Sequence, residues 1–148
     1  MNPDLVKAKL ESLARCLARL REKTPTTEEL FAEDWDSQDL VMKNLERAVQ
    51  VCVDVANHLL SDQGTPPPGS MAMTFLALAR VGVLDGPLAE RLRATVGLRN
   101  LAVHEYESID YRRVYEAVTS GLGVFEDFAR AVLNHLKSVE EYLCRKSP

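Results

Sequence analysis

Five polar residues, four of them ionisable, stand within one short stretch, GLRNLAVHEY (residues 97–106). Histidine exchanges protons near neutral pH, and arginine stays charged and can bind phosphate oxygens through a two-pronged guanidinium. Such a set suits proton transfer beside a phosphate, provided that the fold brings the side chains together. The candidate residues are Arg99, Asn100, His104, Glu105 and Tyr106.

Helical spacing by itself does not bring the set together. In a straight α-helix Asn100 and His104 share a face because they are four residues apart, and Arg99 nearly aligns with Tyr106. Arg99 and His104 are five residues apart and point away from each other. Two arrangements would reunite them: a helix end near residues 102–103, or a symmetric dimer in which each copy contributes to one cleft.

The same residues also have purely structural interpretations. A histidine near a helix end can cap the helix or complement its dipole. Arg99 could form an ion pair with Glu105 or another acid, and Tyr106 could pack on the next helix. Composition and spacing leave both interpretations open.

The elements that must position this set are helices. Apolar residues recur at alternating steps of four and three along three long stretches, and no useful strand-like alternation occurs. With 148 residues, the chain predicts one domain, residues 1–148, folded as an all-α antiparallel bundle of about four to five helices. The apolar stripes are Val6, Leu10, Leu13, Leu17 and Leu20; Val41, Leu45, Ala48, Cys52, Val55 and Leu59; and Val114, Val118, Leu122, Phe125, Ala129, Val132, Leu136, Val139 and Leu143.

Capping residues and helix breakers predict where these helices begin and end. Asn2 and Pro3 open the first helix, which runs to about Lys23. Gly121 and Gly123 are expected to kink or loosen the last helix. The other predicted boundaries are a capping box from Thr26 to Glu29, a long helix from Asp36 and Ser37 to about Leu60, a loop over residues 61–70, a helix from Met71 to Val81 ended by Gly82, a restart at Asp85 with Pro87, and a cap at Ser108 or Asp110.

Composition narrows the classes of function. The net charge of −4 gives no overall attraction to nucleic acid, so any RNA contact has to be local. The three cysteines lie far apart, and neither C-x-x-C nor H-x-x-x-H spacing occurs, so no disulfide framework, metal site or cofactor is expected. The charged N-terminus and the lack of a long apolar run predict a cytoplasmic protein without a signal peptide or membrane span.

Basic residues gather in two regions. Between Pro87 and Arg113 five arginines stand against four acids, which is a weak footprint for RNA. The first helix carries Lys7, Lys9, Arg15, Arg19, Arg21 and Lys23, and a solvated helix face explains them at least as well. Three further candidates have structural interpretations: His58 complements a helix dipole, His135 faces solvent or an interface, and Trp35 anchors a turn between helices.

The segment RNLAVHEY (residues 99–106) matches the R-x-x-x-x-H-x-Y signature of the HepT-like branch of HEPN-domain proteins, including the asparagine that often follows the arginine. The sequences MKNLERAVQVCVDVANHLL and LAERLRATVGLRNLAVHEYESIDYRRVY resemble the long helix and the site-bearing segment of that branch. Together these regions cover most of the chain between residues 28 and 128, and their order and the chain length agree with the branch.

The resemblance implies a metal-independent ribonuclease toxin of a bacterial toxin–antitoxin pair, acting on RNA as a homodimer. It implies that Arg99 and His104 carry out cleavage, with Asn100 in support. It further implies that Tyr106 accepts AMP from a minimal nucleotidyltransferase antitoxin of the MntA type, which silences the toxin. Two alternatives stand beside this reading: a non-catalytic module that binds a nucleotide or a partner, and a domain in which Tyr106 is only a modification target.

Overall fold

The computed structural model describes residues 2–104 and 109–147, and of residues 102–104 it describes the backbone alone. All regular elements among these residues are helices, which confirms the all-α class. They are α1 (Pro3–Lys23), α2 (Glu28–Glu33), α3 (Trp35–Asp62), α4 (Met71–Arg80), α5 (Gly86–His104), α6 (Tyr111–Ser120) and α7 (Gly123–Lys146).

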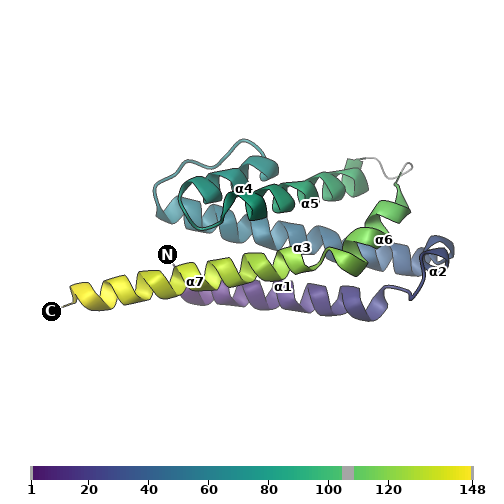
Figure 1. Cartoon of the computed structure of the whole chain (residues 1–148), viewed down its shortest axis with the longest axis horizontal. Helices are drawn as coiled ribbons and strands as arrows, with labels where there is room; N and C mark the ends of the chain where they lie inside the picture. The colour runs from purple at the N-terminus through teal and green to yellow at the C-terminus, as the bar shows by residue number, and fades with distance from the viewer. Residues whose placement is uncertain (1, 105–108, 148) are drawn as a thin grey trace.

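Helix α3 lies at the centre of the molecule. It packs against α1 on one side and against α4 and α5 on the other, and α6 and α7 also contact it (Figure 1). The four long helices α1, α3, α5 and α7 run in alternating directions, and the short helices α2, α4 and α6 connect them in turn (Figure 1). This arrangement is the antiparallel bundle that the apolar stripes predict.

The apolar stripes supply one core. Buried side chains form a single cluster that extends from Val6 on α1 to Leu136 on α7. The third stripe ends earlier than predicted, since Leu143 is 58% exposed. The last turns of α7 extend past the other helices and have nothing to pack against (Figure 1).

The first cap is confirmed and the second is corrected. Asn2 caps α1 by accepting a hydrogen bond from a backbone N–H, and Pro3 occupies the first helical position. Helix α2 is capped by Thr27, whose hydroxyl accepts from the N–H of Leu30 at 3.2 Å, and not by Thr26. Neighbouring threonines can serve equally well in the sequence, and the fold selects one of them.

Helix α3 begins earlier than predicted. Its cap is Asp34, whose carboxylate accepts hydrogen bonds from the N–H groups of Asp36 and Ser37, the residues predicted to start the helix. The hydroxyl of Ser37 donates to the same carboxylate and holds the pKa of Asp34 below its usual value. Trp35 does not anchor the turn, because its side chain is 78% exposed.

The middle boundaries are close to those predicted. Helix α3 continues to Asp62 and α4 ends at Arg80, each within two residues of the expected end. Gly82 follows α4 with a φ of 87°, a backbone conformation that glycine adopts without steric cost. Asp85 caps α5 by accepting a hydrogen bond from the N–H of Leu88 at 2.7 Å.

The predicted last helix is two helices. Its apolar stripe runs on without interruption, but the chain breaks between α6 and α7 at Gly121. A Cβ atom at Gly121 would lie 2.6 Å from the carbonyl oxygen of Ala117, so only glycine fits this close approach of the backbone. At Gly123 a Cβ atom would meet nothing within 4 Å. The first of the two glycines therefore makes the break.

His58 joins two helices. Its Nε2 atom accepts a hydrogen bond from the backbone N–H of Asn2 at 3.2 Å, which ties α3 to the start of α1. His135 is half-buried on α7, and Cys16 and Cys52 are buried in the core. None of the described helices is long and apolar enough to cross a membrane.

Candidate active site

Arg99 continues the buried face of α5. Leu92 and Val96 are buried, at 0% and 2% exposure, and they precede Arg99 by seven and three residues. Residues at this spacing lie on one face of a helix. Arg99 therefore occupies a position where an apolar residue would extend the core, and it is half-buried there. A charge at such a position points to a role other than solubility.

The guanidinium of Arg99 has few partners. Its Nη1 atom donates to Oδ1 of Asn100 at 3.2 Å. Its Nε atom is enclosed and has no hydrogen-bond partner among the described residues. No acid among the described residues lies within ion-pair distance of Arg99. Glu105 is not one of the described residues. Among the described residues, the charge of Arg99 therefore has no counter-ion.

Helix α5 continues to His104, which is its last residue. This end is one to two residues beyond the predicted end near residues 102–103, and the helix does not turn His104 back toward Arg99. The backbone positions of the two residues lie about 140° apart around the helix axis. Asn100 and His104 do share a face, since the helix is continuous between them. Of the remaining motif residues, Tyr106 lies outside the described part of the chain.

The chain after the motif is anchored by aromatic packing. Asp110 caps α6, as predicted, and accepts hydrogen bonds from the first N–H groups of that helix. The ring of Phe31, which is fully buried, contacts the rings of Tyr111 and Tyr115 at centroid distances of 5.9 and 5.7 Å. The hydroxyl of Tyr115 donates to the carbonyl oxygen of Pro25 at 3.0 Å. Helix α6 is thereby fixed against α2 and the end of α1.

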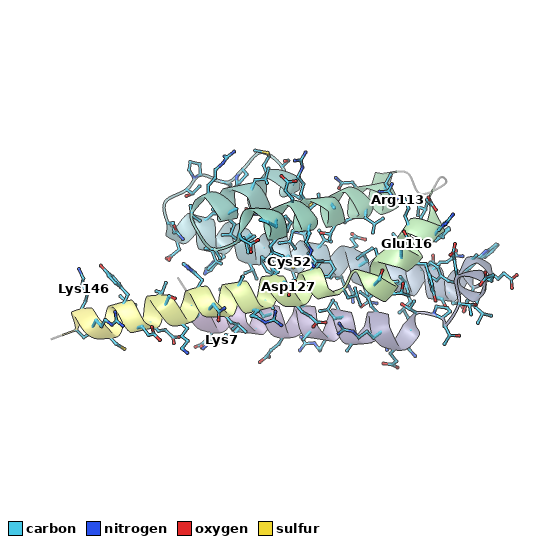
Figure 2. All side chains as sticks on the ribbon, viewed as in Figure 1. Lys7, Cys52, Arg113, Glu116, Asp127 and Lys146 are labelled. Atoms are coloured by element: carbon cyan, nitrogen blue, oxygen red, sulfur yellow. The ribbon has the colours of Figure 1, made fainter. Side chains whose placement is uncertain are left out.

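A cleft lies between α5, α6 and α7, beside the motif. It has a volume of about 490 Å³ and begins at Leu98, the residue before Arg99. Figure 2 shows two of its charged side chains, Arg113 and Glu116, on α6 near the end of α5. The wall also includes Arg91 and the hydroxyl groups of Thr95 and Ser120. Its lining combines charges of both signs, hydroxyl groups and apolar side chains.

Ion pairs decide which arginines near the cleft are free. Arg91 donates to Asp127 on α7 at 2.9 Å, and Arg93 lies 3.5 Å from Glu90. No acid among the described residues pairs with Arg99, Arg112 or Arg113. Near the cleft, the arginines that are unpaired among the described residues thus lie at the end of α5 and the start of α6. No cluster of three possible metal ligands occurs among the side chains that the structure describes.

A family profile described as "Ribonuclease HepT-like" matches residues 13–132. The chain belongs to the HepT-like ribonuclease family. It is 34% identical over 125 residues to an mRNA nuclease HepT of Shewanella oneidensis, an alignment that covers 84% of this chain and 93% of the relative. A tRNA nuclease HepT of Aphanizomenon flos-aquae is 25% identical over 141 residues, or 95% of this chain and 96% of the relative.

Solved structures of this family have the same fold. A tri-AMPylated HEPN toxin of Shewanella oneidensis, in complex with an MNT antitoxin, superposes with a TM-score of 0.83 at 33% identity. The match covers 90% of this chain and 99% of that chain. The HepT-like resemblance read from the motif and its flanking helices is confirmed.

The cleft of this HepT-like ribonuclease was not found from the sequence. Arg113 was counted among the local charges but not singled out, because no periodic signal relates it to Leu98. The two residues meet only through the packing of α6 beside α5. The pairing of Arg91 with Asp127, 36 residues further along the chain, was hidden in the same way.

Proposed function

We propose that this chain is the RNA-cleaving toxin of a bacterial toxin–antitoxin pair, working in the cytoplasm as a homodimer. Membership of the HepT-like ribonuclease family supports the activity. The relatives described as mRNA and tRNA nucleases support RNA as the substrate, and the toxin solved with an MNT antitoxin supports a nucleotidyltransferase partner.

The surroundings of Arg99 carry the proposal within this structure. A half-buried guanidinium with an enclosed Nε and no acid beside it among the described residues is a preorganised positive charge. Such a charge stabilises negative charge that develops in a transition state, because it needs no rearrangement during the reaction. We assign to Arg99 the binding of the phosphate oxygens, with Asn100 orienting its guanidinium through the 3.2 Å contact.

His104 is assigned the proton transfer. As a base it takes the proton of a ribose 2′-hydroxyl, whose oxygen then bonds to the adjacent phosphorus. The bond from phosphorus to the 5′ oxygen breaks, that oxygen receives a proton, and the products end in a 2′,3′-cyclic phosphate and a 5′-hydroxyl. Positioned acid–base catalysis of this kind is typically worth about 10²- to 10⁴-fold. No metal ion is required in this scheme.

The backbone positions of the two residues support the homodimer. Helix α5 is continuous from Arg99 to His104, so the two positions diverge on one copy. A symmetric dimer in which two α5 ends meet would place Arg99 of each copy beside His104 of the other. The proposed cleft of the dimer therefore contains two sets of catalytic residues.

Tyr106 is proposed to be the site that silences the toxin. Its hydroxyl oxygen attacks the α-phosphorus of ATP on the nucleotidyltransferase, forming tyrosyl-AMP and releasing pyrophosphate. The new phosphodiester would lie two residues beyond His104 and compete for the charge of Arg99. The tri-AMPylated relative supports this type of regulation.

The proposal is tested by comparing wild type with His104→Ala. The wild-type protein, expressed without its partner, is expected to slow growth and degrade RNA, and the variant is expected to do neither. Purified protein should give the same contrast, with cyclic phosphate ends detected by mass spectrometry. Equal growth and equal RNA integrity for the two proteins would refute the nuclease.

Modification of Tyr106 is tested separately. Co-expression with an MntA-type nucleotidyltransferase should add AMP groups to the wild-type chain and none to Tyr106→Phe, as measured by intact mass. An unmodified wild-type chain would contradict the silencing step and leave the nuclease untouched. Binding to the partner that depends on Arg99, with RNA left intact, would instead favour a non-catalytic module.

A further inference from the structure

A second set of arginines lies between α1 and α3. Arg15 and Arg19 stand one turn apart on α1, and Arg47 lies across from them on α3. The three side chains line a groove of about 420 Å³, here called the arginine groove. Its other lining residues include Ser12 and Asn44, and none of them is acidic or aromatic.

Ion pairing separates these arginines from the other basic residues of α1. Four of the six basic residues on this helix have a carboxylate oxygen within 4.0 Å: Lys7, Lys9, Arg21 and Lys23. The remaining two, Arg15 and Arg19, have no such partner among the described residues, and neither does Arg47. The two uncompensated residues of α1 are the ones that line the groove.

The arginines of the groove also share neighbours. Arg15 donates to the hydroxyl of Ser12 at 3.0 Å, which holds its side chain along the groove. Cys16 lies in the same lining: burial raises the pKa of its thiol, while the charges of Arg47 and Arg15 act in the opposite direction. Both arginines therefore act on one buried group. Like charges gathered in this way repel each other unless an anion lies between them.

We propose that the arginine groove binds the phosphodiester backbone of the RNA substrate, outside the site of cleavage. The inference rests on the proposed function, which supplies RNA as the polyanion. Guanidinium groups bind phosphate oxygens in a fork, and several of them along one groove follow a nucleic-acid backbone. Without an aromatic side chain there is no platform for stacking a base, so a strand would be held without being read.

The position of the groove predicts which substrates depend on it. Helices α1 and α5 lie on opposite sides of α3 (Figure 1). Packed helix axes are about 8–10 Å apart, so two such layers separate α1 from the helix that carries Arg99. A dinucleotide bound at the end of α5 is too short to reach the groove. Only a longer RNA strand is expected to contact both.

Binding to uncleavable RNA tests the groove directly. The probe is a fluorescent single strand of about 20 nucleotides with 2′-O-methyl riboses, and affinity is measured by anisotropy over a range of salt concentrations. The groove variant is Arg15→Gln with Arg47→Gln, and the matched control is Lys7→Gln with Arg21→Gln, which removes the same net charge from paired residues. Circular dichroism verifies that the exposed substitutions leave the fold intact.

The groove variant is expected to bind the RNA about tenfold or more weakly than wild type, and the control less than about threefold. The slope of log affinity against log salt should fall by about 1.4 in the groove variant, since each lost phosphate contact on a single strand contributes about 0.7. Cleavage of a dinucleotide should not change, whereas cleavage of a long RNA at limiting concentration should slow by the loss in affinity.

Several outcomes would overturn the inference. Equal weakening of RNA binding by the two pairs of substitutions would show a general charge effect. A fall in dimer mass by light scattering in the groove variant would show an interface between copies. If wild type cleaves RNA and the groove variant cleaves long RNA equally well, the groove fails and the nuclease stands. If wild type does not cleave RNA but its RNA affinity depends on the groove, the groove stands and the nuclease fails.

Discussion

Arg91 and Arg99 lie about two turns apart on α5, yet their surroundings are opposite. Arg91 is exposed and forms an ion pair with Asp127 on α7, which also pairs with Arg130 at 3.0 Å. Arg99 is half-buried, with an enclosed Nε and no acid within reach among the described residues. The first arginine joins two helices, and the second has no counter-ion among the described residues.

The difference arises from the helix face on which each residue lies. Eight residues correspond to a rotation of about 80° around a helix. That rotation turns Arg91 toward α7 and the cleft, and Arg99 toward the stripe of Leu92 and Val96. Two arginines on one helix can thus have opposite surroundings, and the type of residue alone does not predict which surroundings each will have.

The largest effect is expected from Arg99→Ala. If Arg99 stabilises the transition state, its loss should lower kcat for RNA cleavage by about 10²- to 10³-fold with little change in melting temperature. Arg91→Ala is the comparison variant on the same helix and should lower kcat far less, because Arg91 is already paired with Asp127. Equal loss of activity in the two variants would erase the distinction between them.

Arg99→Lys sharpens the same test. Lysine keeps the charge but lacks the planar fork and the Nε group that the fold encloses around Arg99. Activity between those of Arg99→Ala and wild type is therefore expected in single-turnover cleavage. Full activity in Arg99→Lys would mean that charge alone, and not the orientation of the guanidinium, is what the site uses.

An intermediate effect is expected at the break between α6 and α7, which sets the walls of the cleft. Gly121→Ala forces a Cβ atom to within 2.6 Å of the Ala117 carbonyl oxygen. Such overpacking typically costs about 1–3 kcal/mol, more than the roughly 0.4–1 kcal/mol gained by restricting the unfolded chain. The melting temperature should fall by about 2–4 °C for each kcal/mol.

Gly123→Ala provides the control for this prediction. Its Cβ atom would meet nothing within 4 Å at the start of α7, so its melting temperature should match or exceed that of wild type. Similar destabilisation by the two alanines, measured by circular dichroism, would mean that the close approach at Gly121 is not what separates α6 from α7.

The smallest effect is expected from the ion pair of Arg91. The hydrogen bond from Arg91 holds the pKa of Asp127 below its usual value, so the carboxylate favours the folded state when it is charged. The contribution is present above the unfolded pKa of about 3.9 and is lost as the pH falls through the lower folded value. Asp127→Asn should therefore melt slightly below wild type at neutral pH, and the gap should close toward about pH 3. A gap in melting temperature that widens in acid would mean that the charged carboxylate of Asp127 destabilises the folded state.

Helix positions were predictable because each apolar stripe buries one face. The exact starts were less so, since several residues near a boundary can cap a helix. At the start of α3 the choice fell on Asp34, and the amide of Gln38 donates to the carbonyl oxygens of Phe31 and Ala32, fixing the first turn against α2. The contact of Gln38 depends on how α2 packs against α3, and no local sequence pattern predicts it. The prediction that Trp35 anchors a turn was wrong because this residue lies off the buried stripe of α3.

The site was predicted in part. The sequence predicted Arg99, Asn100 and His104 as site residues, and it predicted that Arg99 and His104 point away from each other on a straight helix. Their backbone positions do diverge, because α5 continues to His104. The sequence did not supply the enclosure of the Arg99 Nε atom or the arginine groove, since both depend on which residues of other helices lie nearby. The roles of His104 and Tyr106 stay predictions that the variants above test.

The projecting end of α7 carries a natural site for attaching a spectroscopic label. Cys144 lies there and is exposed, whereas Cys16 and Cys52 are buried and have raised thiol pKa values, mainly because burial disfavours the thiolate. A maleimide dye should therefore attach to the natural chain at one position without any substitution. Energy transfer between donor- and acceptor-labelled copies would then report the spacing of two α7 ends, and with it the assembly of the toxin in solution.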